Sequence, residues 1–146
     1  DFHGVYKLAA DGKVTLVSKA VKWPNGIALS RDQKQVYLAV SDSANTRVTV
    51  CDLDGGNLRD VFVAQPLKKA GRPGGCDGLK LDAEGNIWTT GPGGVLILSP
   101  QGKHLGSILF HQPTANLAWG EDGKTLFVTS NHDVFVLRTK VKGAGF

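Results

Sequence analysis

The chain has 146 residues, of which 41% are hydrophobic, and this is enough for one domain with a packed core. Its net charge of +4 comes from lysines and arginines scattered over expected turns and strand edges, with Lys68 and Lys69 as the densest pair. Since no basic helix or RNA-binding aromatic motif accompanies them, a nucleic-acid-binding protein is not expected. No apolar run approaches the length of about 18 residues that a membrane-spanning helix needs.

Short apolar runs separated by glycine-containing turns predict an all-β protein. The chain has 19 glycines and no long stripe of apolar residues with helical spacing. Residues 4–8 and 13–18 are expected to be two strands, joined by a turn that contains Asp11 and Gly12. An Asp-Gly pair between apolar runs is a strong hairpin signal.

A repeat follows this hairpin. Three times, an Asn or Asp stands before a short apolar strand: Asn25, Asp77 and Asn116, with spacings of 52 and 39 residues. The first unit continues through strands at 36–40, 47–52 and 60–64, and a long connection then leads to the second unit. The second runs through 78–82, 86–90, 94–99 and 104–110, and the third has three strands that end near residue 138, before a basic C-terminal tail at 139–146.

This period is typical of the four-stranded blades of a β-propeller. The strands amount to half a blade, two whole blades and most of a fourth, so residues 1–146 are expected to form a partial propeller domain of about three blades. A β-sandwich of about fourteen strands is the alternative, but it gives the repeated Asn and Asp residues no reason to converge. The first residue is Asp1 rather than Met, which indicates an excised piece of a longer protein.

Open strand edges at both ends of such an array need a cover. The candidates are a missing propeller half, a second copy of the chain, or another partner. Cys51 and Cys76 are too few for a disulfide framework or a thiolate zinc site, so free thiols are expected, with one disulfide as the alternative. Trp23, Trp88 and Trp119 are expected to pack between blades rather than to form a ligand cage.

Several strings in the sequence resemble one family. DFHGVYKL, WPNGIALS, CDGLKLDAEGNIWTTGPGGVLILS and TANLAWGEDGKTLFVTS occur in an order similar to that in the C-terminal half of bacterial gluconolactonases. These belong to a family that also contains the senescence marker protein and luciferin-regenerating enzyme. The resemblance implies a six-bladed propeller that hydrolyses a sugar lactone, with one divalent cation, usually Ca²⁺ or Zn²⁺, in the central channel. It also implies a bacterial protein, and leaves open whether it is cytoplasmic or periplasmic.

The family holds this cation through a Glu, the Asn of a Pro-Asn-Gly motif and the Asp of a Pro-Asp-Gly motif. Pro24-Asn25-Gly26 matches the first of these motifs, whereas Cys76-Asp77-Gly78 has cysteine in place of proline. The resemblance therefore implies that Asn25 and Asp77 bind the metal and that Asp77 is also the catalytic general base. The family's Glu has no counterpart, because Glu84 and Glu121 fall in turns at the wrong end of their strands.

Two functions are thus expected. The first is metal-dependent hydrolysis of a sugar lactone, completed by the missing half or a second chain, with Mg²⁺ and Mn²⁺ as further candidates for the metal. The alternative is a non-catalytic half-propeller that self-associates or pairs with a partner. Asn25-Gly26 and Asp77-Gly78 could also be simple turn dipeptides. Further residues are weaker candidates for the mouth of the site: Asn116, Asp42, Asn45 and His132.

Overall fold

The computed structural model describes residues 2–146; Asp1, on which the expectation of an excised start rests, lies outside them. The described chain forms thirteen strands and one short helix. The first sheet contains β1 (Val5–Leu8) and β2 (Val14–Ser18), and the second contains β3 (Pro24–Leu29), β4 (Gln35–Val40), β5 (Arg47–Asp52) and β6 (Arg59–Val63). After helix α1 (Gln65–Lys69), the third contains β7 (Leu79–Leu81), β8 (Ile87–Gly91), β9 (Gly94–Leu98) and β10 (His104–Leu109). The fourth contains β11 (Thr114–Gly120), β12 (Thr125–Ser130) and β13 (Asp133–Arg138).

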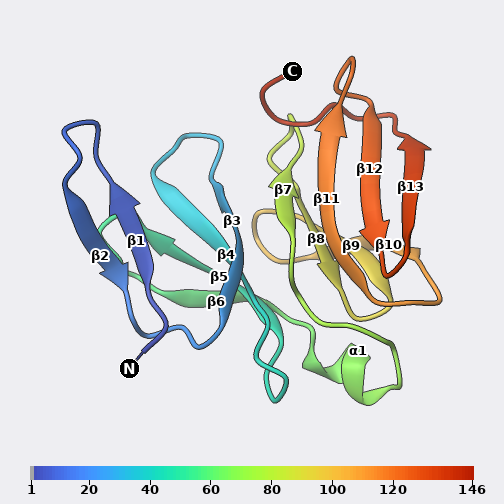
Figure 1. Ribbon diagram of the computed structural model, residues 1–146, viewed down its shortest axis with the longest axis horizontal. Helices are drawn as coiled ribbons and strands as arrows, with labels where there is room; N and C mark the ends of the chain where they lie inside the picture. Colours follow the sequence, from blue (N-terminus) through green and yellow to red (C-terminus); the bar gives the residue numbers. More distant parts are fainter. Residues whose placement is uncertain (1) are drawn as a thin grey trace.

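Each sheet is an antiparallel meander in which neighbouring strands are consecutive in the chain. Figure 1 shows the β1–β2 sheet at one side of the molecule and the β11–β13 sheet at the other. The strand counts of two, four, four and three match the expected half blade, two whole blades and most of a fourth. The all-β prediction is therefore confirmed, whereas the alternative of a single β-sandwich is wrong.

Three separate apolar cores fill the spaces between successive sheets. Strand β4 shows why, since its side chains alternate between two of these cores. Leu38 and Val40 belong to the core against the β1–β2 sheet, while Tyr37 and Ala39 belong to the core against the β7–β10 sheet. A strand that is buried on both faces reads as a continuous apolar run, as VYLAV does here.

Two of the three tryptophans lie in the third core. Trp88 and Trp119 meet edge to face, with ring centroids 5.1 Å apart, and the indole N–H of Trp88 donates a hydrogen bond of 2.9 Å to Asp82. These positions confirm inter-blade packing. For Trp23 the prediction was wrong, because its side chain is 57% exposed and packs on His3, with ring centroids 4.2 Å apart.

The outward faces of the two end sheets carry exposed apolar side chains. On the first sheet, Tyr6 pairs with Leu16 and Leu8 with Val14, and all four are at least 44% exposed. On the last sheet, Val134 and Val136 are exposed in the same way. Both ends of the row of sheets therefore expose apolar faces similar to those that are buried between the inner sheets.

Two segments differ from simple connections. Helix α1 was not predicted, since Pro66 in its first turn is the only residue that signals it. It has five residues, and among residues 2–146 no helix has the length and apolar character needed to cross a membrane. The basic tail crosses the turn ends of two sheets, where the amide N–H of Ala144 donates to the carbonyl oxygen of Leu81.

Main-chain hydrogen bonds join the innermost strands of three sheets. The N–H of Gly26 donates to the carbonyl oxygen of Asp77 over 2.8 Å, and the N–H of Gly78 donates to that of Ala115 over 2.9 Å. A side chain at either glycine would collide with the neighbouring strand: with the Asp77 carbonyl oxygen at position 26, and with Asn116 at position 78. The two glycines thus allow the strands to approach closely.

We expect Gly26→Ala to lower the free energy of unfolding by about 2–3 kcal/mol, because the added methyl group must push the Asp77 strand away. Gly106→Ala is the matched control, since Gly106 also lies in a strand but a methyl group there meets no atom within 4 Å. Urea unfolding of both variants measures the difference. Equal stabilities would contradict the close approach of these strands.

Candidate functional site

Asn25 and Asp77 lie at the same end of two adjacent innermost strands. Asn25 is the second residue of β3, and Asp77 comes two residues before β7. The hydrogen bond between Gly26 and the Asp77 carbonyl group joins their backbones directly. Gly26 lies within β3 and Gly78 immediately before β7, so neither Asn-Gly nor Asp-Gly forms a turn.

The hydrogen bonds of Ser41 determine how the amide of Asn25 is oriented. The Ser41 hydroxyl donates its single hydrogen to the carbonyl oxygen of Cys76 over 2.7 Å. The Asn25 side-chain atom 3.1 Å from the same hydroxyl must then be a donor, which is Nδ2. The Oδ1 atom of the exposed Asn25 side chain is consequently left free to bind a cation or to accept a hydrogen bond.

Both main-chain groups of Cys76 are held by side chains of the β4–β5 connection. Its N–H donates to the buried Thr46 hydroxyl over 2.7 Å, and its carbonyl oxygen accepts from Ser41. Thr46 in turn donates to the carbonyl oxygen of Val40 over 3.2 Å. A proline at position 76 could not make the first of these bonds. Two hydrogen bonds therefore fix the backbone that precedes Asp77.

The Asp77 carboxylate is half-buried and receives no hydrogen bond from any donor in the part of the chain that the structure describes. Burial raises the pKa of this carboxyl group above its ordinary value. A carboxylate that is partly removed from water and has no donor is stabilised by a nearby cation. The environment of Asp77 thus fits an ion-binding role.

Asp77 opens into a hollow of about 460 Å³, called the site hollow below. Polar residues from loops of the second, third and fourth sheets and from α1 line it: Ser41, Asp77, Asn131 and Lys68. The segments at 74–76 and 113–115 complete its wall. Its volume lies within the range of small-molecule sites in proteins.

The donors at this end are hard oxygen atoms, which suit Ca²⁺ or Mg²⁺ better than a soft metal. Asn25 Oδ1 and the Asp77 carboxylate are fewer than the six to eight oxygen atoms that Ca²⁺ takes. Residues 2–146 contain no cluster of three or more His, Cys, Asp or Glu side chains that could hold a metal. Glu84 and Glu121 lie in turns at the other end of their strands, as expected.

The weaker candidates have structural contacts. Asn116 Oδ1 accepts from the N–H of Leu117, and Asp42 Oδ1 accepts from the N–H of Ala44 within its turn. Of the predicted residues, the wall of the site hollow includes Asp77 but not Asn25, Asn45 or His132; it does include Asn131, next to His132. Sequence reasoning missed Ser41, Lys68 and Asn131. Ser41 could have been found, because it directly follows the strand at 36–40, in a loop expected on the same face as the site. Lys68 could not, because no sequence pattern indicated that α1 lies beside the site.

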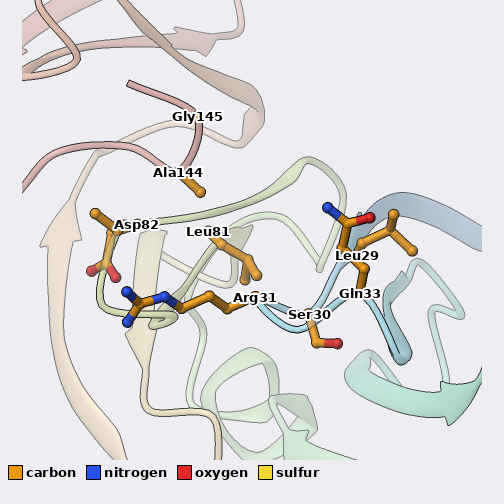
Figure 2. Close-up of a pocket in the computed structure, with 9 residues that line it drawn as sticks. Leu29, Ser30, Arg31, Gln33, Leu81, Asp82, Ala144 and Gly145 are labelled. Atoms are coloured by element: carbon orange, nitrogen blue, oxygen red, sulfur yellow. The ribbon is translucent and has the colours of Figure 1, made fainter.

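A second hollow, of about 420 Å³, lies at the opposite ends of β3 and β7 (Figure 2). Its carboxylate, Asp82, is already saturated: it accepts from the N–H of Glu84, from the main chain and side chain of Asn86, and from Trp88. Figure 2 shows the side chain of Arg31 extending toward Asp82. A cation would meet a positive guanidinium and no free carboxylate oxygen there, so this hollow does not fit a metal.

Comparison with known proteins identifies relatives over nearly the whole chain. The sequence profile of the SMP-30/gluconolactonase/LRE-like region matches residues 2–132. The gluconolactonase of Zymomonas mobilis is 36% identical over 155 aligned positions, which cover 98% of this chain and 42% of that protein. The pentonolactonase of Haloferax volcanii is 30% identical, over 86% of this chain and 44% of that protein.

Solved structures agree with this assignment. A luciferin-regenerating enzyme, 28% identical, superposes with a TM-score of 0.78 over 96% of this chain and 53% of its own. The chain therefore has the propeller architecture of this family and spans about half the length of the relatives that it matches.

Both cysteines are free thiols buried in the interior, as expected, and burial raises the pKa of Cys76 to about 11. Because the thiolate is the reactive form, we expect the Cys51→Ala variant, whose only thiol is Cys76, to react slowly with a disulfide reagent at pH 8. The rate should rise roughly tenfold per pH unit towards pH 11, and unfolding in guanidinium should abolish the protection. Rapid modification of the native variant at pH 7 would contradict this.

Proposed function

The chain belongs to the SMP-30/gluconolactonase/LRE-like family, and we propose that it contributes Asn25 and Asp77 to a site that hydrolyses a sugar lactone with one divalent cation. Its relatives include a gluconolactonase and a pentonolactonase, which supports lactone hydrolysis as the reaction class. Because the chain spans about half of each relative, the remaining ligands come from the missing propeller half or a second chain.

One observation supports the ligand assignment above all others. The bond from Asn25 Nδ2 to Ser41 leaves Asn25 Oδ1 available, and the carboxylate of Asp77, whose backbone is bonded to Gly26, has no donor within residues 2–146. Two oxygen acceptors without protein donors, held on hydrogen-bonded strands, are suited to a cation. Ca²⁺ is the first candidate because both donors are hard oxygen atoms, with Zn²⁺, Mg²⁺ and Mn²⁺ as alternatives.

The proposed reaction adds water to the lactone carbonyl group. The water oxygen forms a bond to the carbonyl carbon, and the Asp77 carboxylate accepts the proton that water loses. The ester bond between the carbonyl carbon and the ring oxygen then breaks, and the proton passes to that oxygen, which gives the open hydroxy acid. When bound, a divalent cation supplies Lewis-acid polarisation of the carbonyl group.

We expect Asp77→Asn to weaken Ca²⁺ binding by at least about tenfold, since it removes the ligand charge and keeps the shape. Asp11→Asn is the control: Asp11 lies in the exposed β1–β2 turn, where its Oδ1 accepts from the N–H of Lys13. Isothermal titration with Ca²⁺, then Zn²⁺, Mg²⁺ and Mn²⁺, measures affinity, and hydrolysis of a sugar lactone measures activity. Lactonase activity that persists in Asp77→Asn, or a propeller completed by the missing half or a second chain that binds none of these cations, would refute the proposal.

A second candidate function, a half-propeller that associates with itself or a partner, is favoured by the exposed apolar faces of the end sheets. We expect Leu16→Lys to reduce self-association and the binding of a hydrophobic dye, because Leu16 lies on the outward face of the first sheet. Thr15→Lys, at a neighbouring exposed position of β2, is the matched control. Light scattering that finds a monodisperse wild-type monomer without dye binding would eliminate this candidate.

A further inference from the structure

The site hollow has two charged residues in its wall. Asp77 and Lys68, the latter from α1, both line it. The hollow therefore combines one carboxylate and one ammonium group, contributed by segments nine residues apart in the sequence.

The ammonium group of Lys68 has no carboxylate partner among residues 2–146. Its side chain is half-buried, whereas that of the adjacent Lys69 is exposed. The ion pairs of residues 2–146 join Arg47 to Asp60, and Arg138 to Glu121 and Asp122, so none of them includes Lys68. The ammonium group of a half-buried lysine without a carboxylate partner is stabilised by an anion that enters the same space.

Opening a lactone creates such an anion. The substrate is a neutral ester, whereas the product at neutral pH is a carboxylate attached to a chain of hydroxyl groups. The hollow offers polar side chains around such a molecule, with Ser41 and Asn131 coming from different sheets. The charge of Lys68 also offsets that of Asp77, which would otherwise repel a carboxylate.

We propose that Lys68 binds the carboxylate of the polyhydroxy acid that lactone opening releases, and that the site hollow is therefore selective for sugar acids over neutral polyols. This inference rests on the proposed function for the identity of the acid. It assigns to α1, a helix within the connection between the second and third sheets (Figure 1), the role of presenting one cation to the site.

The other role open to Lys68 is structural. Lys68 and Lys69 both lie in the last turn of α1, where a positive charge favours the helix dipole. Both lysines have this effect on the helix dipole, but of the two only Lys68 lines the hollow. Lys68→Met and Lys69→Met thus remove the same charge from adjacent positions of one helix and form a matched pair.

The test uses the full 146-residue chain in the presence of Ca²⁺, with sodium gluconate and the neutral polyol sorbitol as probes. Isothermal titration should show tighter binding of gluconate than of sorbitol by the wild type. We expect Lys68→Met to weaken gluconate binding about tenfold and to leave sorbitol binding unchanged. Lys69→Met should change either affinity less than about twofold, and Lys68→Arg should retain most of the preference for gluconate.

Equal losses in Lys68→Met and Lys69→Met would overturn the proposal, since they would reflect net charge alone. So would a wild-type chain that binds gluconate no more tightly than sorbitol. Thermal unfolding of the two methionine variants shows whether a loss of affinity comes from a loss of folding. Selective gluconate binding by this chain, together with no lactonase activity in the completed propeller, would refute the proposed function and leave this inference standing. Lactonase activity of the completed propeller, together with an unchanged affinity of Lys68→Met for gluconate, would do the reverse.

Discussion

The hydrogen bonds between the innermost strands are the constraint on which the rest of the structure depends. Gly26 bonds to Asp77, and Gly78 bonds to Ala115, so three sheets meet along one line. This approach is so close that neither glycine tolerates a side chain. It also brings the residues directly before the two glycines, Asn25 and Asp77, to the same end of adjacent strands. The packing of the blades and the geometry of the candidate site therefore have one physical origin.

The inter-sheet cores explain why the chain forms a row of sheets and also why both ends of the row are incomplete. Each inner sheet is covered on its two faces, so strands such as β4 and β9 contribute alternate residues to two cores. The outward faces of the first and last sheets have apolar residues in the same alternation but nothing against them. Because the chain spans about half the length of its relatives, our proposal assigns the cover of these faces to further blades or a second chain.

The candidate site illustrates how one substitution in a motif can be accommodated. The family resemblance has a proline before the aspartate, where this chain has Cys76. Thr46 and Ser41 hold the N–H and carbonyl groups of Cys76, so hydrogen bonds provide the restraint that a proline ring would have supplied. Ser41 also orients Asn25, and a single hydroxyl group thus links the two residues that we propose as cation ligands.

The sequence by itself determined the strands, the number of strands in each sheet and the two motifs that contain Asn25 and Asp77. These features are local, because the alternation of apolar residues in a strand and the dipeptides that form turns each involve only a few consecutive residues. Only the tertiary structure decided which way the Asn25 amide points, why glycine follows both motif residues, and that Trp23 is exposed. It also decided that Lys68, on a helix with little sequence signal, shares a hollow with Asp77. These outcomes depend on contacts between segments that are distant in the chain, and the pattern within one segment does not encode its neighbour.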